Sequence, residues 1–455
     1  MKRINNIEID LENDDILYFL HIPKTAGISL TNVLDNPFSF DEIYPSVLWV
    51  SLFSKLPKNL GQYKFIRGHF GYWITKFLPK KPVIITMLRK PVDCTLSLYA
   101  HQQRSFRNGE YVLETGRETL DEMFVDPKKA SILTNHQTKT LNLDVDMLSV
   151  IRTLKEKGEN GRTVGEIYRP ETHIQDYDLI KTAKERLSRF EFFGIVERFE
   201  ESLQLLYYTF GWFPIASIPK LNVGTNRKKI DEIPKETLDK IIDATRLDEE
   251  LYNFGEQIFE KRYHQMIDDL KSRYYESRHE KMKFLDMMYD MLETHFFERN
   301  KDYDIDPKNN INYDFGQKMM GSGWQQRELF GNSGTIFRWM GPETKSEIFF
   351  PLTSNVDLKI TASVILQMSK EILDSLRLEV NGYPITLKAT SLDSVKDRKV
   401  EFEGIIPISC LKTQKKLSRI TFRIDKTISP RDIDKNSLDE RKIGLAFDRI
   451  SIEST

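Results

Sequence analysis

The sequence predicts two parts of different architecture: an α/β part with a parallel sheet and flanking helices, then a helical connector and an all-β sandwich domain. Short apolar runs alternate with amphipathic segments in the first half of the chain. Helical spacing prevails from about 235 to 298, and short β-type runs separated by turn residues follow from about 320. The 455 residues exceed the ~150-residue prior for one domain, so we expect more than one hydrophobic core.

Four apolar runs in the first half are expected to form buried parallel strands. They are short, rich in β-branched and aromatic residues, and bounded by polar or turn residues, at 16–22, 64–70, 82–88 and 191–196. The segments between them have apolar residues at three- and four-residue spacing, at 28–35, 91–104, 117–125, 172–189 and 198–210. Strands that alternate with helices predict a parallel sheet covered on both faces.

The second half changes from helical to β-type spacing. An amphipathic helix is expected within 266–298; packing on its own domain is the commoner outcome for such a helix, and pairing in a homodimer is the alternative. The Asn381-Gly382 pair between two alternating runs predicts a hairpin. We therefore expect three parts, namely an α/β domain, a connector with a polar linker, and a sandwich, at 1–265, 266–314 and 315–455.

Composition excludes several classes of partner. The 67 basic and 68 acidic residues leave a net charge of −1, so no whole-chain field favours nucleic acid or an anionic membrane. Cys94 and Cys410 alone cannot build a disulfide framework or a cysteine zinc site. The N-terminus lacks the apolar core of a signal peptide, and no run approaches the ~20 apolar residues of a membrane span. We expect a cytoplasmic protein.

The first strand leads into His21-Ile22-Pro23-Lys24-Thr25-Ala26-Gly27-Ile28-Ser29. Small residues let the backbone approach a ligand, and the amide groups at the start of the next helix favour a phosphate or sulfate. Lys24 adds a charge, and Thr25 and Ser29 add hydroxyl groups. A Walker A loop has its lysine directly after a glycine, whereas Lys24 precedes the only glycine, so ATP or GTP with magnesium is not expected. The alternative is an ordinary turn with a surface lysine.

Two further strand ends carry polar groups that can meet the same ligand. Arg89 follows the third strand, Pro91 begins a helix, and Ser97 lies two turns along it, so both side chains can face one anion; an arginine that caps a sheet edge is the alternative. His69 follows the second strand, where an α/β sheet places reactive groups. A histidine is a suitable base for a hydroxyl at neutral pH, although one histidine of eight is more often structural.

The segment His21–Ser29 resembles the 5′-phosphosulfate-binding motif of sulfotransferases that use 3′-phosphoadenosine 5′-phosphosulfate (PAPS). It is most similar to the branch of the heparan sulfate 2-O-sulfotransferases and their bacterial relatives. The resemblance covers roughly residues 14–265 and implies a P-loop-like sulfotransferase fold. It implies that Lys24 contacts the oxygen between phosphate and sulfate. The residues expected to hold the 5′-phosphate are Thr25, Ala26, Gly27, Ile28 and Ser29.

The same resemblance assigns roles to later residues. Arg89 and Ser97 would bind the 3′-phosphate, whereas Cys94 replaces an arginine common in relatives, so an extra contact from this position is not expected. His69 would be the catalytic base, with His21 a weaker competitor. The segment with the Asn-x-Gln-Thr-Lys pattern lies beside the acceptor site in relatives, and a plain helix end is the alternative. The weak substrate-binding candidates are therefore Asn135, Gln137 and Lys139.

These observations predict a PAPS-dependent sulfotransferase with a carbohydrate or glycolipid acceptor, no metal and no nucleic-acid partner. The alternatives are a non-catalytic glycan-binding or scaffold protein with a vestigial nucleotide site, and a P-loop kinase. The basic loop 221–229 could close over the nucleotide or simply be solvated. The sandwich resembles a domain on bacterial glycosyltransferases; it could bind a carbohydrate or a partner, although Trp324 and Trp339 are more often core residues. We expect 315–455 to fold alone and 1–300 to keep nucleotide binding.

Overall fold

The computed structural model describes most of the chain, with gaps. The described residues are 7–47, 60–107, 118–142, 152, 156, 175–215, 230–301, 306–331, 333–353, 355–391, 399–413 and 415–455. The predicted loop 221–229 lies outside them. The chain forms two compact units. The first, called here the α/β unit, comprises Met1–Gly27, Ile43–Pro214 and Val223–Arg299; the second, the β-rich unit, comprises Ile28–Glu42, Ile215–Asn222 and Asn300–Thr455.

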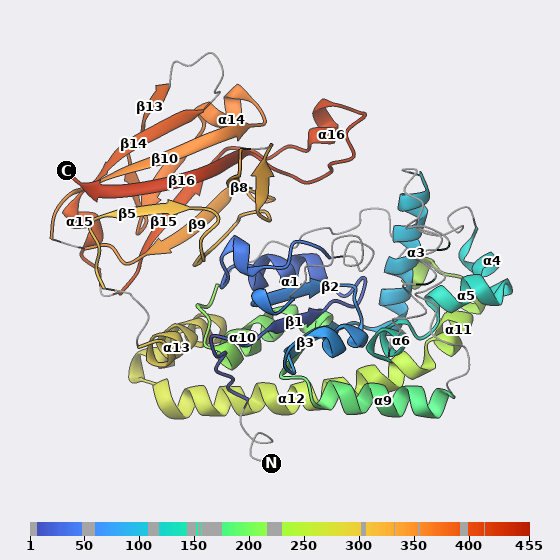
Figure 1. The fold of residues 1–455 in the computed structure, drawn as a ribbon. Coiled ribbons are helices and arrows are strands. Elements are labelled where there is room, and N and C mark those ends of the chain that lie inside the picture. The colour runs from blue at the N-terminus through green and yellow to red at the C-terminus, as the bar shows by residue number, and fades with distance from the viewer. Residues whose placement is uncertain are drawn as a thin grey trace. The chain divides into compact units, whose positions relative to one another are not determined.

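The α/β unit is built on a four-stranded parallel sheet (Figure 1). Its strands are β1 (Leu17–Leu20), β2 (Phe65–Gly68), β3 (Val83–Leu88) and β4 (Phe192–Ile195), in the order β2-β1-β3-β4. All four lie within the predicted runs, and nearly all their residues are buried, as continuous apolar strands require. Because β1 lies between β2 and β3, the carboxyl ends of these three strands are neighbours, and α/β sheets bind ligands at such a point.

Most helices of the α/β unit fall in the segments predicted as helical, whereas α5 and α6 lie outside them. They are α3 (Pro91–Arg107), α4 (Leu120–Val125), α5 (Pro127–Leu133), α6 (His136–Asn142), α9 (Asp176–Ser188), α10 (Phe199–Phe210), α11 (Lys235–Ala244), α12 (Arg246–Tyr274) and α13 (Phe284–Arg299). Local signals define some ends: Thr119 and Glu122 form a capping box at the start of α4, which satisfies amide groups that the first helical turn leaves unpaired.

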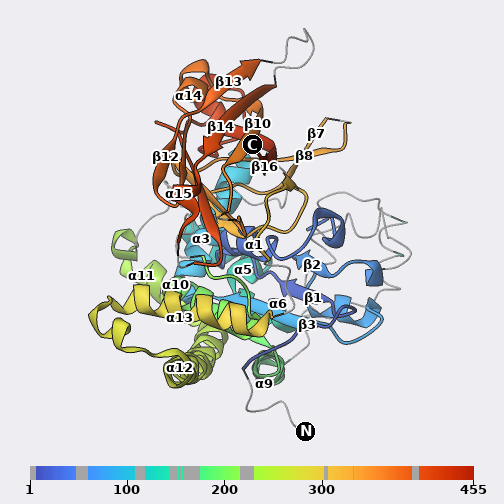
Figure 2. The same cartoon turned by 90° about the vertical axis from the view of Figure 1, so that its left-hand side faces the viewer.

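The predicted connector helix is divided. α12 ends at Tyr274, and α13 begins at Phe284 and packs on α10 and α12. α12 lies across the view in Figure 1 and is seen end-on in Figure 2, where α13 lies across the view. The buried face of α13 includes Met288, Met291 and Phe296. Packing on its own domain, the commoner outcome, is therefore observed, and a homodimer through this segment stays a prediction.

The β-rich unit contains helix α1 (Gly27–Leu34) from Ile28 onward and two antiparallel sheets. The strands are β5 (Ile311–Asp314), β6 (Gly321–Ser322), β7 (Glu328–Phe330), β8 (Thr335–Trp339), β9 (Lys345–Phe350), β10 (Leu358–Gln367), β11 (Arg377–Val380), β12 (Tyr383–Ile385), β13 (Lys388–Ser391), β14 (Val400–Ile406), β15 (Ser418–Arg423) and β16 (Leu445–Ser454). The short helices are α14 (Lys370–Asp374), α15 (Ile408–Leu411) and α16 (Pro430–Ile433).

The two sheets share one apolar core. One sheet has the order β13-β14-β10-β16-β8-β7, with β5 on β16, and the other the order β12-β11-β15-β9-β6 (Figure 1). Side chains from both, such as Ile360 of β10 and Phe422 of β15, belong to the same buried cluster. The Asn381-Gly382 pair joins β11 to β12, with both residues at positive φ, as its hairpin prediction requires. Trp324 and Trp339 are buried, so neither presents its ring at the surface.

Among the described residues, no helix combines the length and the apolar character needed to cross a membrane.

Candidate functional site

The loop after β1 has an unusual backbone conformation. Lys24 and Ala26 adopt positive φ values of 69° and 57°, with Thr25 between them. Non-glycine residues pay about 1–3 kcal/mol for such conformations and occur in them mainly at functional sites. Left-handed residues that alternate with ordinary ones turn successive amide groups toward one point, which makes a concave anion site. The loop therefore has the form of an anion cradle.

Some polar groups of this loop bond within the protein, and others are available to a ligand. The hydroxyl of Thr25 is fully buried and donates to the carbonyl of Ile22 at 2.8 Å. It therefore closes the loop, and Thr25 offers a ligand its amide rather than its hydroxyl proton. Ile28 and Ser29 lie in the first turn of α1, where Ser29 is buried and Ile28 is exposed. The amides of this turn have no helical partner of their own.

Gly27 is required by its contact with His21. A Cβ at position 27 would lie 1.7 Å from Nε2 of His21. The imidazole of His21 therefore lies directly against the backbone at the start of α1. Burial lowers the pKa of His21 well below its ordinary value, with the charges of His69 and Lys24 acting in the same direction. His21 is thus a neutral packing group against the start of α1.

His69 is held at the carboxyl end of β2. Gly68 precedes it at φ 154°, where a Cβ would lie 2.4 Å from the carbonyl oxygen of Val47, and the amide of His69 donates to that same oxygen at 2.9 Å. Nδ1 of His69 lies 2.8 Å from the carbonyl oxygen of His21. A carbonyl only accepts, so Nδ1 carries the proton and Nε2 is the basic nitrogen. Burial lowers the pKa of His69 below its ordinary value, against the opposing effect of this hydrogen bond.

Arg89 at the end of β3 reaches the same loop. Its Nη1 donates to the carbonyl of Lys24 at 2.8 Å, while its Nε is buried and has no hydrogen-bond partner within the part of the chain that the structure describes. A buried, unpaired guanidinium donor is costly unless a ligand completes it. Cys94 on α3 lies 3.7 Å, Sγ to oxygen, from the carbonyl of Pro23, and Ser97 follows on the same helix.

Gln137 fixes the backbone of Arg89. Its Oε1 accepts from the Arg89 amide at 2.9 Å, and its Nε2 donates to the Arg89 carbonyl at 2.7 Å. The carboxylate of Asp248 accepts from the amides of Gln137 at 3.0 Å and Thr138 at 2.7 Å. Asp248 therefore caps the first turn of α6, and Gln137 binds the backbone of Arg89 through two hydrogen bonds, called here the clasp. The side chain of Arg89 in turn donates to the carbonyl of Lys24. Burial raises the pKa of Asp248, although these hydrogen bonds oppose the rise.

The other two residues predicted beside the acceptor also have partners within the protein. Oδ1 of Asn135 accepts from the amides of Leu247 at 3.0 Å and Asp248 at 3.3 Å. Nζ of Lys139 donates to the carbonyl of Ser131 at 3.2 Å. The geometry gives Asn135 and Gln137 supporting contacts, and their contact with an acceptor stays a prediction.

Cationic groups surround Lys24. Burial, together with the charges of Arg104 and Arg89, lowers its pKa to about 8. Burial lowers the pKa of His101 to about 4, again with Lys24 and Arg104 contributing. His101 and Arg104 were missed by the sequence analysis. Because they follow Ser97 by four and seven residues on α3, helical spacing could have placed them on its face.

His136 is a further imidazole close to this group. Burial lowers its pKa to about 4, and the charge of His69 contributes. Its Nε2 is buried without a hydrogen-bond partner among the residues covered by the structure. The carboxyl ends of β1, β2 and β3 thus bring together Lys24, His69 and Arg89, and His136 lies within electrostatic reach of His69.

These positions suit a ligand with several negative charges. The loop conformation directs amide groups to one point, and the Nε of Arg89 lacks a partner among the described residues. Burial and the charges of Arg104 and Arg89 lower the pKa of Lys24, and a bound polyanion would offset the effect of these charges. The nucleotide PAPS, with a 3′-phosphate and a 5′-phosphosulfate, fits this donor set. Over the described ranges, no group of three or more histidine, cysteine or carboxylate residues is placed to hold a metal ion.

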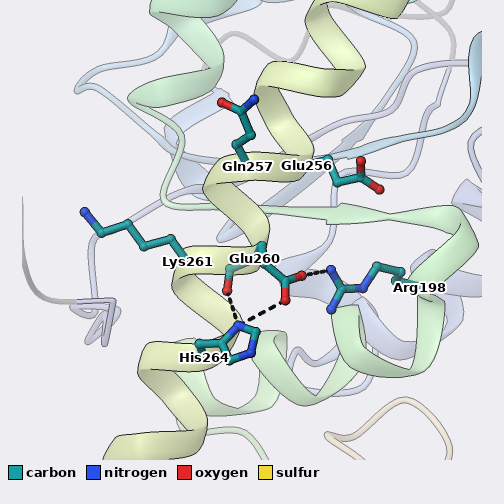
Figure 3. Close-up of a pocket in the computed structure, with 6 residues that line it drawn as sticks. All are labelled: Arg198, Glu256, Gln257, Glu260, Lys261 and His264. Carbon is teal, nitrogen blue, oxygen red and sulfur yellow. Dashed lines mark hydrogen bonds and ion pairs between the residues drawn. The ribbon is translucent and has the colours of Figure 1, made fainter.

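A separate pocket of about 600 Å³ lies on the surface of α12 (Figure 3). Its lining residues are Arg198, Glu256, Gln257, Glu260, Lys261 and His264. Glu260 pairs with Arg198 and, at 3.1 Å, with Nδ1 of His264. None of these residues was predicted in the site, and their charges largely neutralise one another.

Comparisons with known proteins point to sulfotransferases. No protein-family profile matches the chain. It is 24% identical over 339 residues to the human protein "Heparan-sulfate 6-O-sulfotransferase 2", covering 64% of this chain and 52% of that one. It is 23% identical over 329 residues to the protein of the same name from Gallus gallus, covering 62% and 76%. The chain therefore spans about half the length of the human relative.

This distant similarity supports the sulfotransferase part of the sequence resemblance. The relatives found are 6-O-sulfotransferases, so the 2-O branch and the bacterial type stay predictions. Among solved structures, a family 35 carbohydrate binding module from Clostridium thermocellum covers 32% of this chain at 9% identity with a TM-score of 0.20. That score is too low to support an argument about the fold of the sandwich.

Proposed function

We propose that this protein transfers the sulfuryl group of PAPS to a hydroxyl group of a carbohydrate or glycolipid acceptor. The observation that carries the proposal is the cradle formed by Lys24, Thr25 and Ala26, next to His69 at the carboxyl ends of neighbouring strands. Distant similarity to heparan-sulfate 6-O-sulfotransferases supports the same activity class. The acceptor class comes from the sequence resemblance and the printed names of these relatives.

The nucleotide is bound by groups from two strand ends. The amides from Thr25 to Ser29 hold the 5′-phosphate, and Lys24 adds the charge nearest to it. Arg89 and Ser97 hold the 3′-phosphate, for which the buried Nε of Arg89 is a ready donor. The clasp by Gln137 orients Arg89 before the nucleotide binds, which reduces the entropy lost on binding.

His69 and Lys24 carry the chemistry. When bound, PAPS supplies a sulfuryl group whose bond to the 5′-phosphate oxygen breaks as the acceptor oxygen bonds to sulfur. Nε2 of His69 accepts the proton of the acceptor hydroxyl, because Nδ1 is already protonated toward His21. The lowered pKa of His69 keeps the imidazole neutral and ready to accept at neutral pH. Lys24 stabilises the negative charge left on the departing phosphate.

The test is turnover of labelled PAPS by the variant His69→Ala across a panel of carbohydrate and glycolipid acceptors. We expect transfer to fall by ~10² or more, as for a lost general base, while affinity for 3′-phosphoadenosine 5′-phosphate (PAP) stays near that of the unmodified protein. His264→Ala, an exposed histidine on α12, is the matched control. Retained transfer in His69→Ala would refute the assignment of the base and direct attention to His136.

A titration with PAP, ATP and GTP tests the activity class. We expect PAP to bind most tightly, because only PAP carries the 3′-phosphate that Arg89 and Ser97 are proposed to hold. Tighter binding of ATP or GTP would favour a P-loop kinase. Binding of none of the three would favour a glycan-binding or scaffold protein with a vestigial site.

A further inference from the structure

Helix α1 directly follows the anion cradle along the chain. The helix begins at Gly27, the residue after Ala26, and the chain from Ile28 to Glu42 is part of the compact β-rich unit. Fixing one end of a short helix fixes the direction of the amides at its other end. The contacts at the carboxyl end of α1 therefore bear on the cradle.

The β-rich unit holds α1 and the residues after it through backbone and amide groups. Nδ2 of Asn32 donates to the carbonyl of Trp324 at 2.6 Å. The amide of Met319 donates to the carbonyl of Asn36 at 2.8 Å, and the amide of Phe40 donates to the carbonyl of Gly316 at 2.8 Å. These hydrogen bonds join segments about 280 or more residues apart in sequence, as in the 292-residue separation of the first pair.

Arg327 adds a charged contact just beyond this end of the helix. Its guanidinium donates to the carbonyls of Phe315 at 2.9 Å, Gln317 at 2.6 Å and Asp35 at 3.1 Å. Asp35 directly follows the last residue of α1. A positive charge at the carboxyl end of a helix complements the helix dipole, whose positive end lies at the cradle.

Arg338 of β8 makes the second charged contact. It is fully buried, with 0% exposure, and its Nη1 donates to Oδ1 of Asn36 at 3.0 Å. Burial lowers its pKa to about 9. Its Nε and Nη2 have no hydrogen-bond partner among the described residues. Burying a guanidinium with so few partners is costly, so packing alone does not explain why an arginine occupies this position.

We propose that Arg327 and Arg338 are positioning residues for the anion cradle: they hold the carboxyl end of α1 and thereby fix its first-turn amides. This inference rests on the proposed function and extends it, because the first-turn amides of α1 are among the groups proposed to hold the 5′-phosphate. The sequence analysis expected residues 1–300 to keep nucleotide binding. The contacts of α1 lead to the opposite expectation for any chain without β8.

The first test uses the full-length variant Arg338→Met and two nucleotides. PAP has the 5′-phosphate that the cradle would hold, and adenosine 3′-phosphate lacks it. We expect affinity for PAP to fall about tenfold, within the range for residues that act through a packed network, while affinity for adenosine 3′-phosphate stays unchanged. Arg377→Met, which removes an exposed arginine paired with Asp425, is the matched control. A merely destabilised protein would lose affinity for both nucleotides.

The second test needs no nucleotide. Hydrogen–deuterium exchange of the amides in 28–36 should be faster in Arg338→Met than in the unmodified protein or in Arg377→Met. If Arg338→Met fails to fold, Asn32→Leu, which removes only the hydrogen bond to Trp324, takes its place in both tests.

The outcomes separate this inference from the proposed function. Unchanged exchange at 28–36, or an unchanged ratio of the two affinities, overturns the inference. If the unmodified protein binds neither nucleotide, the proposed function fails, and the exchange result alone then decides whether the two arginines hold α1.

Discussion

The charge of Lys24 should control the alkaline limit of activity. Burial and the nearby arginines lower its pKa to about 8. A lysine with a lowered pKa loses its proton as the pH rises through that value, so kcat/KM should be nearly constant below pH ~7, fall to about half at pH ~8 and continue to fall above it. One pH unit above the pKa leaves about one tenth of the molecules protonated, so we expect a roughly tenfold loss near pH ~9.

The variant Lys24→Arg tests this reasoning. A guanidinium stays protonated over this range, so the fall of kcat/KM at alkaline pH should disappear. The value of kcat/KM at lower pH should also decrease, because the planar guanidinium of arginine does not reproduce the point charge of lysine. Initial rates with labelled PAPS give kcat/KM at each pH. The affinity for PAP at each pH shows the ionisation of Lys24 without an acceptor present. Lys129→Arg, at a lysine paired with Glu118, is the control. An alkaline fall that persists in Lys24→Arg would refute the assignment.

Two substitutions test the supports of the site. Gln137→Met removes both hydrogen bonds to the Arg89 backbone. Because two such bonds are worth about 1–3 kcal/mol, PAP affinity measured by calorimetry should fall roughly tenfold, whereas the control Gln103→Met on α3 should leave it unchanged. Equal PAP affinities in the two variants would contradict the role of Gln137 in orienting Arg89. Gly27→Ala should abolish PAP binding because the new Cβ meets the His21 ring. The double variant Gly27→Ala/His21→Ala should recover part of it, and no recovery would contradict that steric explanation.

The sheet and the cradle could be predicted because their signals are local. Buried parallel strands are continuous apolar runs, and the loop composition after β1 already indicates an anion site. The position of Arg89 followed from its place after the third strand.

The supports of the site could not be predicted in the same way. Gln137 and Asp248 are 111 residues apart, and a single polar contact over that distance leaves no periodic pattern. The resemblance placed Gln137 beside the acceptor, which stays a prediction, whereas its hydrogen bonds to the backbone of Arg89 had no signal in the sequence. The contacts of α1 with Arg327 and Arg338 were missed for the same reason, since each arginine is an isolated residue in a β-type pattern.

The link from Asp248 through Gln137 and Arg89 to Lys24 also has a consequence for biosynthesis. The cradle is synthesised before Asp248, which is 224 residues later (248 − 24), so its bracing waits for that residue. At ~5–20 residues per second, that delay is on the order of ten to forty seconds. During this interval the nascent chain carries a cationic loop without its final support, so we expect tight nucleotide binding only after Asp248 has been made.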